Sequence, residues 1–87
     1  MARYRIVFRK SVAKDLRRIP KKDVTRILRR IDALADEPRP AGAEKLSEQE
    51  RYRVRQGVYR ILYEIADDEL IVTVVKVGHR REVYRRG

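Results

Sequence analysis

The feature that most constrains the fold is the succession of three β-rich segments in the C-terminal half of the chain. Residues 51–56, 58–65 and 70–77 are rich in β-branched and aromatic residues, which are typical of strands. The breaks at Gln56-Gly57 and at residues 66–69 are suitable hairpin connections. We therefore predict that these segments form an antiparallel meander.

Residues 3–8 predict one further strand, because apolar side chains alternate there with arginines. The alternation does not decide whether this strand joins the sheet at an edge or in the middle. Two sets of side chains lie on opposite faces of the predicted strand: Tyr4, Ile6 and Phe8 on one, Arg3 and Arg5 on the other.

Two amphipathic helices are predicted between this strand and the meander. Ser11 is a suitable N-cap for the first helix, and Pro20 ends it. Asp23 is well placed to cap the second helix. The short connection through Pro20 makes the two an antiparallel helical hairpin. Their apolar stripes have helical spacing and comprise Val12, Leu16 and Ile19, then Val24, Ile27, Leu28, Ile31, Leu34 and Ala35.

The segment 36–50 contains two prolines, a glycine and mixed charge, and we expect it to be a loop. The predicted order is therefore β-α-α-β-β-β, in a single domain of residues 1–87. An α+β fold buries the apolar stripes most simply, with the N-terminal strand and the helical hairpin packed on a mainly antiparallel sheet.

The predicted register of the first hairpin gathers arginines on one face of the sheet. If Gln56-Gly57 is a two-residue turn, Arg53 lies directly opposite Arg60, and Arg55 shares their face. Like charges that face each other across strands destabilise a sheet by about 0.2–1 kcal/mol. Either an acid such as Glu64 or a loop carboxylate neutralises the cluster, or solvent screens it, or the cluster binds anions. The opposite face is apolar and contains Tyr52, Val54, Tyr59, Ile61, Tyr63, Val72 and Val74.

The composition supports anion binding and excludes several classes of site. Lys and Arg outnumber Asp and Glu by 23 to 13, and the resulting net charge of +10 favours polyanionic partners. The chain has no cysteine and one histidine, so we expect no disulfide, no thiol chemistry, and neither a metal nor a cofactor. It has no apolar leader and no stretch of membrane-spanning length, so we expect a cytoplasmic protein without a membrane span.

Groups suited to proton transfer follow the last predicted strand. Gly78 allows the backbone to bend, and His79, Arg80 and Tyr84 come within a few residues. A lone histidine or a terminal tyrosine is more often structural. Beside an arginine cluster, however, these side chains are suited to acid–base chemistry at a phosphate.

Three motifs resemble the RelE/ParE superfamily of toxin–antitoxin toxins: Tyr52-Arg53-Val54-Arg55, Tyr59-Arg60-Ile61-Leu62-Tyr63, and Val77-Gly78-His79-Arg80-Arg81-Glu82-Val83-Tyr84. The resemblance extends over essentially the whole chain and implies a RelE-like fold. It is closer to the RelE branch, whose members cut mRNA in the ribosomal A site, than to the ParE branch, whose members poison DNA gyrase. Basic residues match that branch at positions 53, 55, 60 and 80, and a tyrosine matches at 84, although some members have lysines at the first two.

The resemblance implies a toxin of a type II toxin–antitoxin system that cleaves mRNA on the ribosome without a metal. The ribose 2′-OH attacks the adjacent phosphate and leaves a 2′,3′-cyclic phosphate and a 5′-OH. Arg60 and Arg80 are suited to stabilise charge on the phosphate oxygens, while Tyr84 and His79 are suited to transfer protons. The RNA-binding residues implied are Arg53, Arg55 and Arg81.

The same resemblance implies a cognate antitoxin, besides the ribosome and mRNA. An acidic, partly disordered partner that folds on binding would neutralise the basic surface. Two alternatives stay open: a ParE-type toxin that inhibits gyrase and has no nuclease activity, and a non-catalytic RNA-binding domain.

Overall fold

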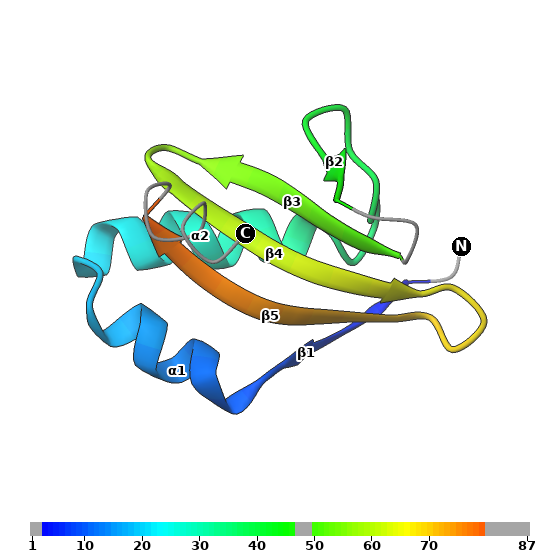
Figure 1. Cartoon of the computed structure of the whole chain (residues 1–87), viewed down its shortest axis with the longest axis horizontal. Helices are drawn as coiled ribbons and strands as arrows, with labels where there is room; N and C mark the ends of the chain where they lie inside the picture. The colour runs from blue at the N-terminus through cyan, green and yellow to red at the C-terminus, as the bar shows by residue number, and fades with distance from the viewer. Residues whose placement is uncertain (1–2, 47–49, 80–87) are drawn as a thin grey trace.

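The computed structural model of the protein describes residues 3–46 and 50–79. Within them the element order is β-α-α-β-β-β-β (Figure 1). The bounds are Arg5–Phe8 (β1), Lys10–Arg17 (α1), Lys21–Ala33 (α2), Glu44–Lys45 (β2), Arg51–Gln56 (β3), Tyr59–Ala66 (β4) and Ile71–His79 (β5). The predicted α+β class is confirmed, with β2 as an additional strand.

One five-stranded sheet, in the order β1-β5-β4-β3-β2, contains all of these strands. β3, β4 and β5 form the predicted antiparallel meander, and β2 extends it by pairing antiparallel with β3. β1 lies at the opposite edge and pairs parallel with residues 71–74 of β5, so the sheet is mixed. The prediction that residues 36–50 form only a loop was wrong, because β2 lies within them.

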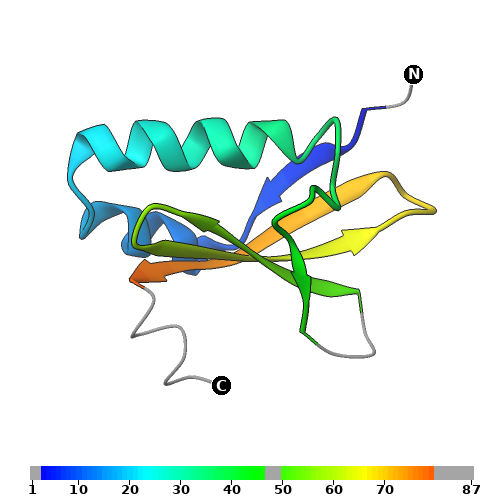
Figure 2. The same cartoon turned by 90° about the horizontal axis from the view of Figure 1, so that it is seen from above.

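The two helices occupy different places on this sheet. α2 crosses one face, whereas α1 lies along β5 beyond the point where β1 ends (Figures 1 and 2). Most of the predicted apolar side chains are buried between the helices and the sheet. Phe8 and Leu28 lie at the border of the buried surface and are 44% and 40% exposed. The buried core cluster is Val12, Ile19, Ile27, Ile31, Leu34, Tyr52, Val54, Ile61, Tyr63, Ile65, Val72, Val74 and Val77.

Neither predicted helix cap forms. α1 has Arg9 at its N-cap and already includes Ser11, and α2 has Pro20 at its N-cap; neither cap residue makes a side-chain hydrogen bond to the helix. Asp23 instead lies in the first turn of α2, where a negative charge interacts favourably with the helix dipole.

The β3–β4 turn is Gly57-Val58 rather than Gln56-Gly57. Gly57 has a φ of 61°, a conformation that glycine adopts without steric cost. The register therefore differs from the predicted one by two residues, and Arg55, rather than Arg53, pairs with Arg60. Because side chains alternate with a period of two, this difference leaves the predicted faces unchanged.

A bulge interrupts the pairing of β4 with β5. Leu62 pairs with Lys76, but the next residue, Tyr63, pairs with Val74, so Val75 is the extra residue. Bulges bend a strand and increase its twist. The last part of β5, residues 76–79, thus follows the bulge and runs beside the first part of β4.

Candidate functional site

Three arginines share the sheet face that is turned away from the core. Arg53 and Arg55 alternate along β3 with buried Tyr52 and Val54, and Arg60 is paired with Arg55. The predicted grouping on one face is therefore confirmed, although the facing pair is Arg55 and Arg60. This pair lies at the end of the sheet where the β3–β4 hairpin turns.

The environments of the three arginines differ. Arg53 forms an ion pair with Glu44 of β2, with 3.2 Å between its Nη2 and the carboxylate Oε1, and its side chain is only 15% exposed. Arg55 is exposed and, among the described residues, has no ion pair. Arg60 is 4% exposed. The predicted neutralisation by a carboxylate thus occurs at Arg53, whereas Glu64 pairs with Arg51 and, at 3.6 Å, with Arg9.

The end of β5 lies beside this arginine pair. Gly78 is the strand partner of Arg60, and His79 is the partner of Tyr59. The rings of Tyr59 and His79 meet edge to face, with their centroids 6.2 Å apart and their planes at 81°. Because neighbouring side chains on a strand alternate, His79 lies on the side of Tyr59 rather than that of Arg60.

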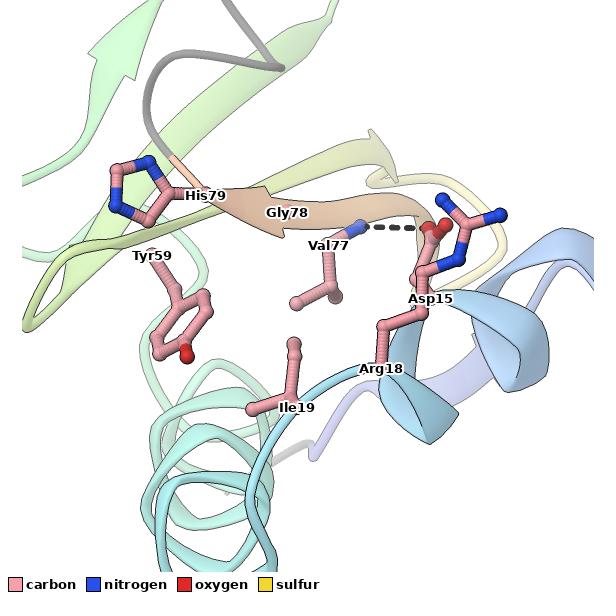
Figure 3. A pocket seen from close by; sticks show the side chains of 7 residues that line it. All are labelled: Asp15, Arg18, Ile19, Tyr59, Val77, Gly78 and His79. Atoms are coloured by element: carbon pink, nitrogen blue, oxygen red, sulfur yellow. Dashed lines mark hydrogen bonds between the residues drawn. The ribbon is translucent and has the colours of Figure 1, made fainter.

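A hollow of about 250 Å³ lies between α1 and this end of β5 (Figure 3). Its polar groups come from both elements, and Tyr59 and His79 form one wall. The lining residues are Asp15, Arg18, Ile19, Tyr59, Val77, Gly78 and His79.

Asp15 connects α1 to β5, a contact that was not predicted from the sequence. Its Oδ2 accepts a hydrogen bond from the backbone N–H of Val77 at 3.1 Å, and its Oδ1 accepts one from Lys76 Nζ at 3.4 Å. Val77 is buried, and a buried N–H that loses its acceptor costs about 1–3 kcal/mol. The one available signal was that Asp15 is the only acid in a helix of basic and apolar residues.

The other predicted site residues are Arg80, Arg81 and Tyr84, and they lie outside the described residues. The structure therefore places Arg53, Arg55, Arg60 and His79 around one end of the sheet, and the three remaining predictions stay predictions.

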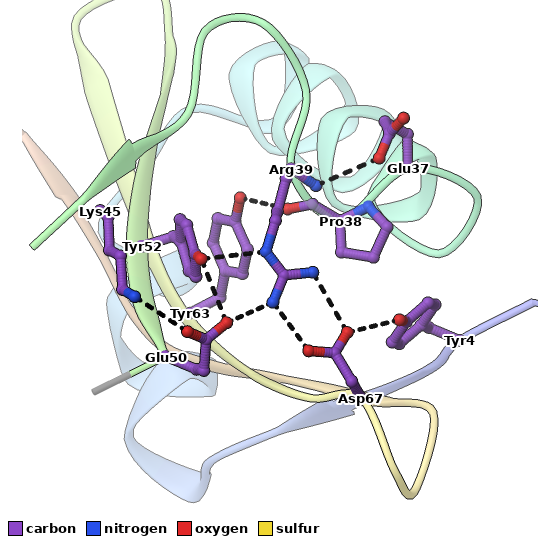
Figure 4. Close-up of polar contacts among 9 residues, drawn as sticks. All are labelled: Tyr4, Glu37, Pro38, Arg39, Lys45, Glu50, Tyr52, Tyr63 and Asp67. Atoms are coloured by element: carbon purple, nitrogen blue, oxygen red, sulfur yellow. Dashed lines mark hydrogen bonds and ion pairs between the residues drawn. The ribbon is translucent and has the colours of Figure 1, made fainter. Parts of the chain in front are cut away.

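A second cluster of charges lies at the opposite end of the sheet, around Arg39 (Figure 4). Arg39 donates to both carboxylate oxygens of Asp67 at 3.1 and 2.8 Å, to the Tyr52 hydroxyl at 2.9 Å, and to Glu50. The Tyr4 hydroxyl donates to Asp67 at 2.6 Å. Hydrogen bonds from Arg39 and then from Tyr4 lower the pKa of Asp67 to about 2. This cluster joins four segments of the chain and is structural in character.

The described part of the chain contains no group of three or more His, Cys, Asp or Glu side chains arranged to hold a metal ion. Among the helices in residues 3–46 and 50–79, none is long and apolar enough to span a membrane.

The family model described as the ParE toxin of type II toxin–antitoxin systems, parDE, matches residues 6–84. The chain belongs to the RelE/ParE superfamily of toxins. This membership confirms the resemblance drawn from the three sequence motifs. Toxin RelG of Mycobacterium tuberculosis is 29% identical to this toxin over 85 residues, which cover 95% of this chain and 98% of RelG.

Solved structures of RelE toxins have the same fold. The toxin–antitoxin complex RelBE2 from Mycobacterium tuberculosis gives a TM-score of 0.80 at 26% identity, covering 92% of this chain and 94% of that chain. The archaeal RelE–RelB complex from Pyrococcus horikoshii gives a TM-score of 0.77 at 29% identity, covering 88% of this chain and 94% of that chain. This protein is therefore a toxin of a type II toxin–antitoxin system, with the fold of the RelE toxins.

Proposed function

We propose that this toxin is an endoribonuclease that cleaves mRNA on the ribosome, in the cytoplasm, and so inhibits translation. The observation that carries the proposal is the facing pair of Arg55 and Arg60. Two arginines at facing strand positions can donate several charge-assisted hydrogen bonds to one phosphate. Like charges on facing strands by themselves destabilise a sheet, and an anion bound between them would offset that repulsion.

The proposed reaction needs no metal. The ribose 2′ oxygen forms a bond to phosphorus while the bond from phosphorus to the 5′ oxygen breaks, which leaves a 2′,3′-cyclic phosphate and a 5′-OH. A base takes the 2′-OH proton, and an acid gives a proton to the departing 5′ oxygen. Arg60 and Arg80 hold the non-bridging oxygens, where negative charge increases in the transition state.

Proton transfer is assigned mainly to Tyr84, with His79 in support. Arginine is unsuited to this step because it stays protonated at any physiological pH. The position of His79 on the side of Tyr59, rather than that of Arg60, supports its secondary role. We assign RNA binding to Arg53, Arg55 and Arg81; Arg55 is exposed, whereas Arg53 is half-buried and Arg60 is buried.

We also propose that an acidic, partly disordered antitoxin masks the +10 chain. The RelE-family toxins of the two similar structures are in complexes with antitoxins, and this supports an antitoxin of the RelB type here. The ribosome completes the site by holding the mRNA, so we expect only weak cleavage of naked RNA.

The test is a cell-free translation reaction to which purified toxin is added, followed by mapping of mRNA 5′ ends. We expect new 5′ ends with the wild type and a rate about 10²-fold lower with Arg60→Ala, as for the loss of one preorganised electrostatic donor. Arg51→Ala is the matched control, because Arg51 lies on the same face but is paired with Glu64. Since Arg60 is buried, circular dichroism must show that the variant is folded, and Arg60→Lys, which keeps the charge, should recover part of the rate.

The same assay separates the proton-transfer roles and the alternatives. Tyr84→Phe should slow cleavage more than His79→Ala, and near-wild-type rates for both would remove the assignment. Intact mRNA in the presence of active toxin, together with inhibited DNA supercoiling by gyrase, would replace the nuclease with a gyrase inhibitor. RNA binding without cleavage or growth arrest would indicate a binding domain.

A further inference from the structure

Within residues 3–46 and 50–79, no strand pairs with the outer side of the C-terminal part of β5. β1 pairs with β5 only as far as Phe8 and Val74, and the last contact is the Arg9 N–H, which donates to the Val74 carbonyl at 3.0 Å. Beyond this point the bulge at Val75 shifts the register with β4. The one described strand that pairs with residues 76–79 is therefore β4.

α1 covers this outer side, and Asp15 accepts a backbone hydrogen bond that a neighbouring strand would otherwise accept. Its Oδ2 binds the backbone N–H of Val77 (Figure 3), and its Oδ1 binds the side chain of the preceding residue, Lys76. The Asp15 side chain is itself only 15% exposed, so water competes weakly for these bonds. Asp15 thus fixes β5 one residue before Gly78.

Gly78 and His79 are the residues through which β5 meets the candidate site. Gly78 pairs with Arg60, and His79 pairs with Tyr59. A displacement of Val77 changes both pairings, because a strand transmits a shift of one residue to the next. Asp15 is connected to both pairings through the backbone of β5, because it holds the N–H of Val77, the residue that precedes Gly78.

We propose that Asp15 is a positioning residue for RNA cleavage: by holding Val77 and Lys76 from α1, it sets the end of β5 against Arg60. This inference rests on the proposed nuclease activity. A loss of position by about 1 Å can cost about 10²-fold in rate even when substrate still binds. We therefore expect Asp15→Ala to lower kcat by about 10- to 100-fold with little change in KM.

The experiment combines cleavage kinetics on ribosome-bound mRNA with NMR of the isolated toxin. Asp15→Asn keeps an oxygen that can accept the Val77 N–H, so it should recover most of the kcat lost in Asp15→Ala. Asp32→Asn is the matched control: it removes a helix carboxylate whose described partner is the exposed Arg3 rather than a residue of β5, and it should leave kcat unchanged. In the NMR measurement, amide exchange at Val77 should accelerate in Asp15→Ala, and the resonances of His79, the only histidine, should shift.

The two readouts separate failure of this inference from failure of the proposed function. Fast Val77 exchange with wild-type kcat would overturn it, and so would a loss in Asp15→Asn as large as that in Asp15→Ala. Unchanged Val77 exchange and His79 resonances in Asp15→Ala would overturn it as well, whatever the kinetics. If the wild type cleaves no mRNA, the nuclease proposal fails and this role falls with it, while the NMR arm still shows whether Asp15 holds β5.

Discussion

At one end of the sheet Arg39 is surrounded by acceptors, and at the other Arg55 faces Arg60. Arg39 uses its guanidinium to join Glu50, Tyr52 and Asp67, three positions that lie far from it in the sequence (Figure 4). The opposite end puts two positive side chains on facing strands. The same residue type therefore meets acceptors at one end of the sheet and a like charge on the facing strand at the other.

This contrast between Arg39 and Arg55 indicates which guanidinium group is available to bind a ligand. The donors of Arg39 are already engaged within the chain, and its guanidinium also lies 5.3 Å from the Tyr52 ring centroid. Exposed Arg55 has donors that can bind a phosphate. Proteins often tolerate local destabilisation at functional sites, and the Arg55–Arg60 pair fits that pattern.

Arg55→Glu should have the largest effect of the changes predicted here. It should make the end of the sheet that holds Arg55 and Arg60 more stable but less active in cleavage. An opposite-charge pair with Arg60 should raise the free energy of unfolding by about 0.2–1 kcal/mol. The same change repels phosphate and should lower the cleavage rate by about 10- to 100-fold. Urea unfolding and the cell-free cleavage assay measure the two effects on one preparation.

Arg26→Glu is the matched control, since it makes the same charge change on the exposed surface of α2. It should leave cleavage much closer to the wild-type rate. A stabilised Arg55→Glu variant with undiminished cleavage would show that the arginine pair has no part in binding RNA.

Arg39→Ala should have the opposite result: it should lower the stability of the fold and leave cleavage unchanged. It removes hydrogen bonds to two carboxylates and a hydroxyl, and we expect a loss of about 1–2 kcal/mol in the free energy of unfolding, since partial exposure reduces what charge-assisted bonds contribute. Cleavage per folded molecule should stay at the wild-type level. A rate that falls more than the folded fraction would mean that the two ends are coupled.

The sequence patterns predicted the elements that depend on local periodicity. The hairpin register was wrong by two residues, yet the faces were right, because any even shift preserves the alternation. β2 was missed because Glu44 and Lys45 are both charged and carry no apolar alternation. Its pairing is nevertheless what places Glu44 beside Arg53.

The contacts that the sequence could not predict are those between distant positions. Asp15 binds Val77, and Arg39 binds Asp67, without any motif that connects the members of either pair. Each depends on how α1 and the loop after α2 pack on the finished sheet. The arginines of β3 and β4 were predictable because a short hairpin fixes their relation.

The smallest predicted effect concerns how the stability contributed by the Arg39–Asp67 contact depends on pH. The folded state lowers the pKa of Asp67 from the ordinary value of 3.8 to about 2, so the ionised carboxylate favours folding. That contribution is fully present above about pH 5 and is lost as the pH falls through the folded pKa. Asp67→Asn should therefore unfold at a lower temperature than the wild type at pH 7, with the difference shrinking between pH 4 and pH 2.

Thermal unfolding followed by circular dichroism at several pH values measures this difference. Asp68→Asn is the control, because Asp68 is exposed in the same turn and has no ion pair among the described residues. Its melting temperature should follow that of the wild type at every pH. A difference between Asp67→Asn and the wild type that persists unchanged at pH 2 would show that the Asp67 charge is not what joins this turn to Arg39. The connection would then be the hydrogen bonds from Tyr4 and Arg39 to the uncharged carboxyl group.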